Sequence, residues 1–260
     1  MFAAERKRII KKYLLENSKA EVVKISDILD VSEVTVRRDF EKLEHEGFLI
    51  RTHGGAILHD PHEKTYYAEQ DMEADENNQE IVETAAALVK DEDIIMLTGG
   101  HINQLLARKL SERQGLTILT NDLVAALNAS AGGMNRVICL GGEIEQDNFS
   151  VSGSITLRNM QKYHVNRVFV EVDGISENLD LSVSSQQKSE LIESAVQSSD
   201  HVTLLCNYEL IGKRAFLSLG PITMMNSVIT NPQLADEYKI AIYNKNVILY
   251  TSINAFEGNV

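Results

Sequence analysis

The side chains most capable of chemistry in this chain stand at the start of one predicted helix. Ser32 is a favourable N-cap, because its hydroxyl accepts a hydrogen bond from an amide of the first turn, and Gly47 is a typical C-cap. Between them, Thr35, Arg37 and Arg38 lie in the N-terminal half of the helix. Guanidinium and hydroxyl groups in this position are typical of side chains that contact DNA bases and phosphates. The segment therefore predicts a helix that enters the major groove.

A short apolar strand and a basic turn follow this helix. The strand is predicted over Phe48–Ile50, and the glycine-rich turn over Arg51–Gly55 contains Arg51 and His53. A helix followed by a strand and a basic turn is what a winged helix-turn-helix offers to DNA, with the turn as the wing. The alternative is an ordinary surface helix and hairpin whose arginines are only solvated.

The elements that must position this helix precede it. A first helix is predicted over Glu5–Glu16, and Glu21–Lys24 is predicted as a short strand that pairs with the wing. Ser26 is predicted to cap a short helix that ends at Leu29, and Asp30-Val31 to turn into the DNA-contacting helix. The apolar face of that helix is predicted to contain Val34, Val36, Phe40 and Leu43.

Together these segments resemble the DNA-binding domain of the DeoR family of bacterial transcriptional regulators. The resemblance is carried by Val23–Ser32, Ser32–Phe40 and Arg51–Ala56, and it covers residues 1–57. It implies a transcriptional regulator that binds double-stranded operator DNA. A homo-oligomer that represses transcription is expected, because one winged helix covers only a few base pairs and two joined heads add their contacts. Asp39 is expected to be a partner of an arginine within the domain rather than a base-reading residue. The expected DNA-binding residues are Arg6, Lys24, Ser32, Thr35, Arg37, Arg38, Arg51 and His53.

The distribution of charge agrees with this assignment although the net charge of the chain is −13. Residues 1–58 contain 11 Lys and Arg against 10 Asp and Glu, a balance of +1, and the remainder contains 14 against 28, a balance of −14. Affinity for phosphates depends on where the cations are placed. An acidic second part would repel the duplex from every surface except the intended one.

Composition limits the remaining possibilities. The chain of 260 residues is 43% hydrophobic and 24% charged, as expected for a small and a larger globular domain. No apolar run approaches the length of a membrane span, and Cys139 and Cys206, which lie in apolar strand-like runs, are expected to be buried thiols in a reducing cytoplasm. His59 and His62 have no further ligands at metal spacing, so a polar linker is favoured over a metal site. The predicted domains are 1–57, a linker and bridging helix over 58–78, and an effector-binding and oligomerisation domain over 79–260.

Beyond the linker, short apolar runs alternate with helical patterns. This alternation predicts an α/β domain with a mainly parallel sheet. The predicted strands are Ile94–Leu97, Thr117–Leu119, Arg136–Leu140, Arg167–Val172, Val202–Leu205, Ser227–Thr230 and Val247–Tyr250. The predicted helices are Glu80–Lys90, Asn103–Arg113, Leu123–Ser130, Ile155–Tyr163, Gln187–Ser198 and Pro232–Tyr238.

Polar and glycine residues follow several of these strands. Ligands of parallel sheets collect at the carboxyl ends of the strands, where loops meet helix N-termini, and glycines let backbone amides approach an anion there. A shared effector pocket is therefore predicted, in which Gly99 and Gly100 donate amides and Asn121, Asp173 and Asn207 bond hydroxyl groups. The candidate residues are Thr98, Gly99, Gly100, His101, Asn121, Asp122, Gly141, Gly142, Asp173, Gly174, Lys188, Asn207 and Lys213.

The same loops resemble the C-terminal sensor domain of the DeoR family. The matching segments include Thr120–Asp122, Leu140–Gly142 and Phe169–Ile175. The resemblance implies the fold of ribose-5-phosphate isomerase and a phosphorylated sugar as inducer. Two loops depart from the family pattern. An Asp-Ser-Gly-Thr-Thr type phosphate loop is replaced by Thr98–Ile102, and an Asp-x-Ser-Lys segment is replaced by Asn207–Leu210, so an expected lysine is leucine.

These departures argue against catalysis and against a strongly anionic effector. An isomerase needs a positioned base and a group that stabilises an enediolate, and the expected acids are Thr98 and Asn207 while the expected lysine is Leu210. A leucine supplies no charge for phosphate, although Lys188, Lys213 or Arg214 remain nearby in sequence. The chain is thus predicted to be a regulator without a cofactor that responds to a sugar or sugar phosphate. An alternative is a C-terminal domain that only oligomerises; a sugar-phosphate isomerase is the less favoured one.

Overall fold

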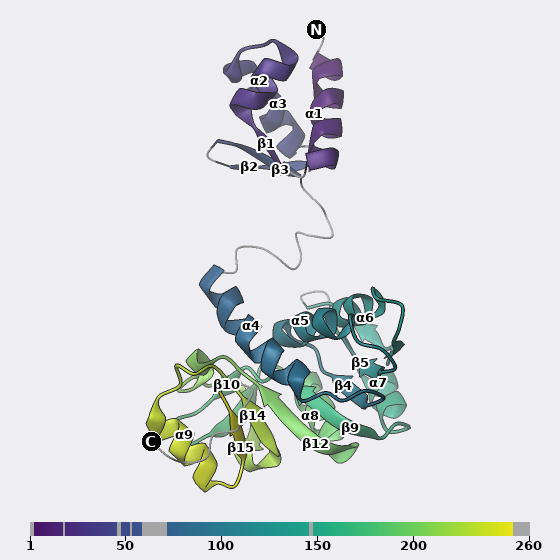
Figure 1. Cartoon of the computed structure of the whole chain (residues 1–260), viewed down its shortest axis with the longest axis vertical. Helices are drawn as coiled ribbons and strands as arrows, with labels where there is room; N and C mark the ends of the chain where they lie inside the picture. Colours follow the sequence, from purple (N-terminus) through teal and green to yellow (C-terminus); the bar gives the residue numbers. More distant parts are fainter. Residues whose placement is uncertain are drawn as a thin grey trace. The chain divides into compact units, whose positions relative to one another are not determined.

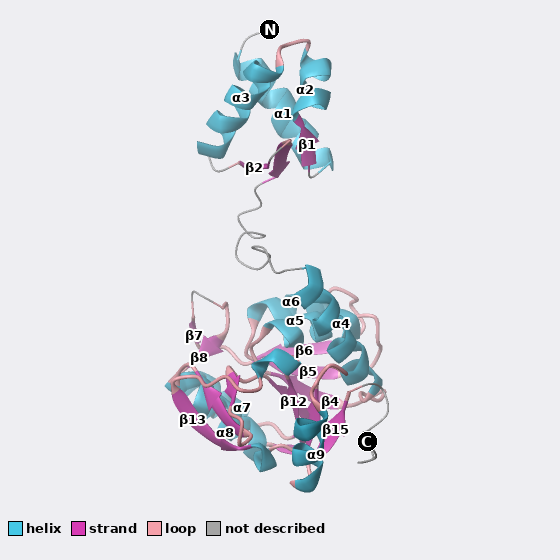
Figure 2. Ribbon diagram, turned by 90° about the vertical axis from the view of Figure 1, so that its left-hand side faces the viewer, coloured by secondary structure: helices cyan, strands magenta, loops and turns pink. Residues whose placement is uncertain are grey.

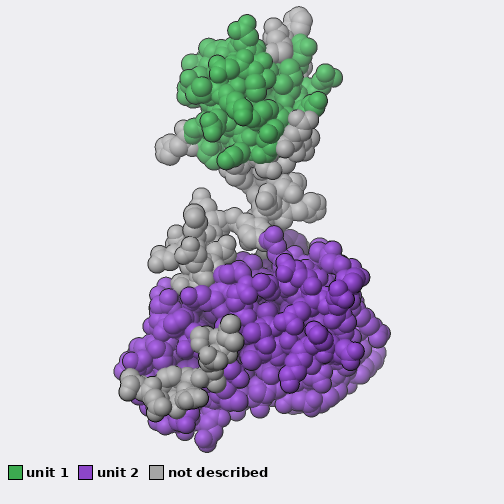
Figure 3. Space-filling view, in the orientation of Figure 1, with its two compact units in different colours: residues 1–70 green, residues 71–260 purple. Residues whose placement is uncertain are grey.

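The chain forms two compact units, residues 1–70 and residues 71–260 (Figure 3). The computed structural model describes residues 3–17, 19–45, 48–52, 54–58, 72–145 and 148–251. His53, Gly47 and the linker histidines His59 and His62 lie outside the described residues. The domain boundaries at 57 and 79 stay predictions.

The first unit is a winged helix-turn-helix (Figure 1). Its three-stranded antiparallel sheet has the order β1-β3-β2. The helices are α1 (Ala3–Asn17), α2 (Val22–Leu29) and α3 (Glu33–His45), and the strands are β1 (Lys19–Glu21), β2 (Leu49–Thr52) and β3 (Gly55–Leu58). Burial of apolar side chains from all three helices holds the unit together, namely Ile10, Leu14, Ile25, Leu29, Val36, Phe40 and Leu43.

Two local predictions for this unit are corrected. The strand that pairs with the wing lies at β1 rather than Glu21–Lys24, and α2 already begins at Val22, whose amide donates to the Gly54 carbonyl at 3.0 Å. Ser26 therefore lies inside α2, where its hydroxyl donates to the Val23 carbonyl at 2.7 Å. The turn between α2 and α3 is as predicted, because Asp30 takes the left-handed conformation with φ 50°.

Val34 is also placed wrongly by the sequence pattern. Residues two apart on a helix point in nearly opposite directions, so Val34 and Val36 do not share a face. Val36, Phe40 and Leu43 are buried, whereas Val34 is 58% exposed. An exposed apolar residue at the start of α3 belongs to the outer surface of the helix.

The second unit is built on a seven-stranded parallel sheet with the order β15-β14-β12-β9-β4-β5-β6 (Figure 2). Every strand predicted for this domain belongs to that sheet, which confirms the predicted fold class. The strands are β4 (Ile94–Leu97), β5 (Thr117–Thr120), β6 (Arg136–Cys139), β9 (Val165–Val170), β12 (Ser199–Leu205), β14 (Ser227–Ile229) and β15 (Ile248–Tyr250).

Helices cover both faces of this sheet. Alternate strand residues face opposite sides: Ile95 and Leu97 pack with α4 (Met72–Ala87), α5 (His101–Leu110) and α6 (Leu123–Ser130). Met96 packs on the other side, in a cluster that includes residues of α7 (Ser154–Met160), α8 (Gln186–Gln197) and α9 (Asp236–Asn244). The prediction of a helix over Pro232–Tyr238 is corrected, since Ala235 is the N-cap of α9.

Two small sheets were absent from the sequence prediction. One is a hairpin of β7 (Glu143–Ile144) and β8 (Val151–Ser152). The other consists of β10 (Gly174–Ile175), β11 (Asp180–Val183) and β13 (Leu217–Pro221). Two short 3₁₀ helices, Tyr208–Leu210 and Ile222–Met224, complete the unit.

The cysteines differ in exposure. Cys206 is buried, as predicted, and burial raises the pKa of its thiol to about 12. Cys139 is exposed, which corrects the prediction, because β6 is an edge strand of the large sheet. Within the part of the chain that the structure describes, no helix has both the length and the apolar character that a membrane span requires.

Candidate nucleic-acid interface and ligand cavity

The start of α3 presents an exposed face to solvent. Ser32 caps the helix, since its Oγ accepts from the Thr35 amide at 3.3 Å and lies 2.9 Å from the Thr35 hydroxyl. Val34, Arg37 and Arg38 are exposed, and their spacing of three and four residues puts them on one side of the helix. We call these three residues the α3 outer face. It combines two guanidinium groups with an apolar side chain that suits contact with a thymine methyl group.

One exposed ion pair lies on this face, and a second joins α3 to β2. The Arg37 guanidinium lies 2.7 Å from the Glu33 carboxylate, one helical turn away. Arg51, on β2, lies 2.8 Å from the carboxylate of Glu44 on α3. Exposed pairs of this kind contribute little to stability and exchange readily with other partners. Both arginines therefore remain accessible to an anionic partner.

Arg6 does not belong to this exposed surface. Its guanidinium lies 2.6 Å from the Asp39 carboxylate, and the two side chains are only 13% and 2% exposed. The expectation that Asp39 is an intradomain partner is thus confirmed, although its arginine comes from α1 and not from α3. Lys24 is exposed on α2, with its ammonium 5.7 Å from the centre of the Tyr13 ring.

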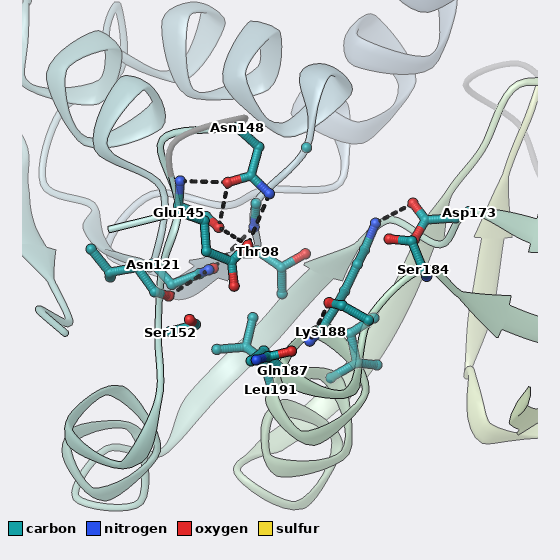
Figure 4. Close-up of a pocket in the computed structure, with 16 residues that line it drawn as sticks. Thr98, Asn121, Glu145, Asn148, Ser152, Asp173, Ser184, Gln187, Lys188 and Leu191 are labelled. Atoms are coloured by element: carbon teal, nitrogen blue, oxygen red, sulfur yellow. Dashed lines mark hydrogen bonds and ion pairs between the residues drawn. The ribbon is translucent and has the colours of Figure 1, made fainter. Parts of the chain in front are cut away.

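In the second unit a cavity of about 630 Å³ opens at the carboxyl ends of the central strands (Figure 4). It brings together several residues predicted from the strand ends: Thr98, Gly99, Gly100, Asn121, Asp173 and Lys188. Sequence reasoning missed the rest of its lining, which comes from the β7–β8 hairpin and from the start of α8. These further residues are Glu145, Asn148, Ser150, Val151, Ser152, Ser184, Ser185, Gln187, Leu191 and Ile192.

The remaining predicted effector residues do not line the cavity. Asp122 is buried and caps α6, where it accepts from the Ala125 amide at 2.8 Å and from Gln104 at 2.9 Å; burial raises its pKa despite these bonds. Asn207 caps the 3₁₀ helix by accepting from the Glu209 amide at 3.1 Å. The others outside the lining are His101, Gly141, Gly142, Gly174 and Lys213.

Two of the glycines outside the lining have structural reasons. A Cβ at Gly142, whose φ is 143°, would lie 2.1 Å from the Thr156 hydroxyl. A Cβ at Gly174 would lie 2.7 Å from the Ser182 hydroxyl and 2.8 Å from the Ala215 amide. Close backbone approach therefore explains both residues without a ligand.

Asp173 and Lys188 form an ion pair on the cavity wall. Their Oδ1 and Nζ atoms lie 2.5 Å apart, and the second carboxylate oxygen accepts from the Ser184 amide at 2.7 Å (Figure 4). Burial opposes ionisation of Asp173, but Lys188 and Ser184 outweigh it, so the pKa of Asp173 lies below its usual value. Leu210, at the position of the expected lysine, is half-buried against the apolar core.

Glu171 was also missed by the sequence reasoning. It follows β9, and its Oε1 accepts from the Asn103 amide in the first turn of α5 at 2.6 Å. Desolvation raises the pKa of Glu171 to about 7. The sequence feature that could have indicated this residue is the presence of an acidic side chain within the apolar strand-like run Arg167–Val172.

A winged helix-turn-helix with two exposed arginines on its outer face, joined in one chain to a larger α/β unit, is the architecture of a DNA-binding regulator. The DeoR-like helix-turn-helix domain matches residues 6–62, and the DeoR C-terminal sensor domain matches residues 73–232. The chain belongs to the DeoR family and is a DNA-binding transcriptional regulator, not an enzyme.

Characterised relatives agree with this assignment. The lactose phosphotransferase system repressor of Streptococcus mutans is 30% identical over 90% of this chain and 94% of its own length. The transcriptional repressor GlcR of Bacillus subtilis is 28% identical over 89% of each chain. A ribose 5-phosphate isomerase from Methanocaldococcus jannaschii is 16% identical, with a TM-score of 0.39 over 53% of this chain and 54% of the isomerase.

Proposed function

We propose that this regulator represses transcription by binding operator DNA through the α3 outer face, and that a small hydroxylated effector in the cavity of the second unit releases it. The exposed triad of Val34, Arg37 and Arg38 on α3 carries the DNA-binding part of this proposal. A carbohydrate or polyol catabolic operon is the proposed target, since one relative is named a lactose phosphotransferase system repressor. Action on operator DNA implies the cytoplasm.

On DNA, the start of α3 enters the major groove and the wing contacts the backbone. One of Arg37 and Arg38 reads a guanine edge and the other contacts phosphate. Ser32 and Thr35 lie at the same helix start, and Lys24, Arg51 and His53 supply further phosphate contacts. Arg6 is omitted, because its guanidinium is held by Asp39 in the interior of the unit.

Two such units act together. A single winged helix covers a half-site of only a few base pairs, and linking two of them raises the effective concentration of the second on DNA. The larger unit is the proposed joining surface of a homo-oligomer. Sedimentation velocity on operator DNA with two half-sites should give at least two chains per duplex; monomers alone, with and without DNA, would exclude this arrangement.

The effector binds in the cavity. Its lining supplies amides and hydroxyls from Asn121, Asn148, Ser150 and Ser152, which match the donors and acceptors of a hydroxylated metabolite. Such a ligand releases DNA only if it binds the DNA-free arrangement more tightly than the DNA-bound one. Lys188 lines this cavity. Lys188→Met should weaken both effector binding and effector-dependent release, whereas it should leave the affinity for DNA without effector unchanged.

The direct test of DNA binding is an Arg37→Ala, Arg38→Ala double variant. Duplexes selected by the wild-type protein from a random pool supply the operator, and fluorescence anisotropy gives the affinity across salt concentrations. We expect the affinity to fall by about 100-fold and the salt slope to fall by about one or two. Arg158→Ala, which removes an exposed arginine from α7, is the matched control and should change neither quantity. An unchanged affinity and slope in the double variant would remove α3 from the interface.

A further inference from the structure

The N-terminus of α5 is closed by a carboxylate of the chain itself. Glu171 Oε1 accepts from the Asn103 amide at 2.6 Å, and the Ile102 amide also donates to this carboxylate. A Cβ at Gly100, whose φ is 152°, would lie 2.4 Å from the Glu171 carboxylate, so the carboxylate packs directly against the loop. The first amides of a helix and its positive dipole end normally attract an anion from outside. In this chain Glu171 occupies that position.

The neighbouring amides of the loop are used as well. The Gly99 amide donates to the Asn121 side chain at 3.0 Å. The Gly100 amide donates to Asp122, the cap of α6. The two backbone donors that the sequence assigned to a ligand are therefore bonded to side chains of the protein. A phosphate at this loop would have to displace carboxylate or amide groups that are already in place.

The charges around the cavity point in the same direction. Among the described residues that line it, Lys188 is the only cation, and it is paired with Asp173 at 2.5 Å. Glu145 adds a second carboxylate to the lining. The carboxylate of Glu171 packs against Gly100, which is itself a lining residue. A phosphate dianion would thus meet more carboxylates than cations at short range, where repulsion between like charges is strong.

We infer that Glu171 is a built-in anion that excludes phosphate from the α5 N-terminus, so that the cavity selects an uncharged, hydroxyl-rich effector. This inference rests on the proposed sensing function of the cavity. The lining then acts through neutral groups: Asn121, Asn148, Ser150, Ser152 and Gln187 both donate and accept hydrogen bonds. Asp173 and Glu145 accept from hydroxyl groups of the ligand.

Thermal unfolding of the full chain with inorganic phosphate tests the role of Glu171 directly. The measurement is made at pH 8, above the pKa of about 7 for Glu171, with chloride at matched ionic strength as reference. Phosphate should leave the wild type unchanged. It should raise the Tm of Glu171→Ala by about 3 to 5 °C at ten times its Kd, because the freed amides of Ile102 and Asn103 then bind it.

Two matched variants test whether phosphate is excluded because a side chain occupies the α5 amides. Glu171→Gln keeps an acceptor over the amides without the charge, and Glu145→Ala removes a cavity carboxylate that accepts from Asn148 and Ser150. Neither should gain phosphate binding as Glu171→Ala does. A phosphate-induced Tm increase in the wild type as large as that of Glu171→Ala would overturn the inference. Should Glu171→Ala fail to fold, perturbation of the Gly99–Gln104 amide resonances of the wild type by phosphate would overturn it equally.

A second arm distinguishes this inference from the proposed function. Calorimetry of the wild type with hexitols, pentitols, aldoses and their phosphate esters should find binding by a neutral compound and at least about tenfold weaker binding by its ester. Gain of phosphate binding by Glu171→Ala with no neutral ligand for the wild type would support the role of Glu171 and contradict the sensing function. Tighter binding of the esters to the wild type would contradict the inference while supporting the sensing function.

Discussion

The start of α3 in the first unit and the start of α5 in the second unit are both helix N-termini that the sequence analysis assigned to a partner, the first to DNA and the second to a small effector. At α3 the cap is the neutral hydroxyl of Ser32, and Ser32, Val34, Arg37 and Arg38 are exposed. At α5 the carboxylate of Glu171 accepts hydrogen bonds from the first amides of the helix. It also packs so closely against Gly100 that no side chain would fit at that position. The same backbone feature is thus open at one helix and filled at the other.

This difference shows that a helix start becomes an anion site only when the rest of the fold leaves it vacant. The acids near the two helices illustrate how this is decided. Asp39 on α3 is paired with Arg6 from α1, which takes its charge away from the outer face. Glu171 is instead bonded by the first amides of α5, and Lys188 favours its ionised form. The charge that a helix presents is therefore determined by contacts distant in sequence.

The largest expected effect concerns the anchor of α3. Asp39→Ala removes the carboxylate that lies 2.6 Å from the poorly exposed Arg6 guanidinium, and loss of one partner of a poorly exposed ion pair is strongly destabilising. We expect the Tm of the first unit to fall by on the order of 10 °C. Calorimetry of the full chain measures this transition. Glu33→Ala, which removes the exposed partner of Arg37, is the control, and an equal effect of both variants would contradict the special role of the buried pair.

Replacing the N-cap residue of α3 by an acid places a carboxylate at the start of α3, as Glu171 does at the start of α5. Ser32→Asp keeps a good N-cap but places a carboxylate where DNA phosphate approaches. We expect unchanged thermal stability and an operator affinity about tenfold lower, because the added charge repels phosphate. Ser32→Asn is the neutral control and should retain most of the affinity. Equal affinities of the Asp and Asn variants would mean that the start of α3 does not face DNA.

A smaller effect is expected from the titration of Glu171. Its pKa of about 7 in the folded chain lies above the ordinary value of 4.5, so between these pH values the folded protein holds a proton that the unfolded chain releases. The free energy of unfolding should therefore fall as pH rises from 4.5 to 7, by about 1 to 2 kcal/mol more in the wild type than in Glu171→Gln.

Denaturant unfolding of both proteins at several pH values measures this difference. The charged groups that act on Glu171 are Lys188, which favours its ionised form, and Asp122, which opposes it. Neither residue is changed in the Glu171→Gln variant, so their own titration cancels in the comparison. Parallel pH profiles for the two proteins would show that Glu171 has an ordinary pKa.

The sequence was most informative where burial produces a simple pattern. The strands of the large sheet are continuous apolar runs because helices cover both faces, and all of them were predicted. The small sheets were missed, since β7, β8 and β10 contain only two residues each and show no alternation. Their absence from the prediction hid the β7–β8 hairpin residues of the cavity, such as Ser150 and Ser152.

The site was predictable only in part, because several roles depend on long-range contacts. Asn121, Asp173 and Lys188 were found from their places after strands and in the family pattern, and they line the cavity. Glu171 meets Asn103 across 68 positions of the chain, and Arg6 meets Asp39 across 33. From charge and spacing alone, Arg6 was assigned to DNA and Glu171 was overlooked. The residues that they contact, Asp39 and Asn103, are distant in the sequence and are not part of either local pattern.

Effector-dependent release of operator DNA tests the central claim most directly. The wild-type protein is bound to its selected duplex at pH 8, and anisotropy is followed as neutral polyols and sugars, or their phosphate esters, are added. The contrast between the open α3 start and the filled α5 start predicts release by a neutral compound, with its ester at least about tenfold less effective. Release by a phosphate ester, with no effect of its unphosphorylated parent, would contradict it.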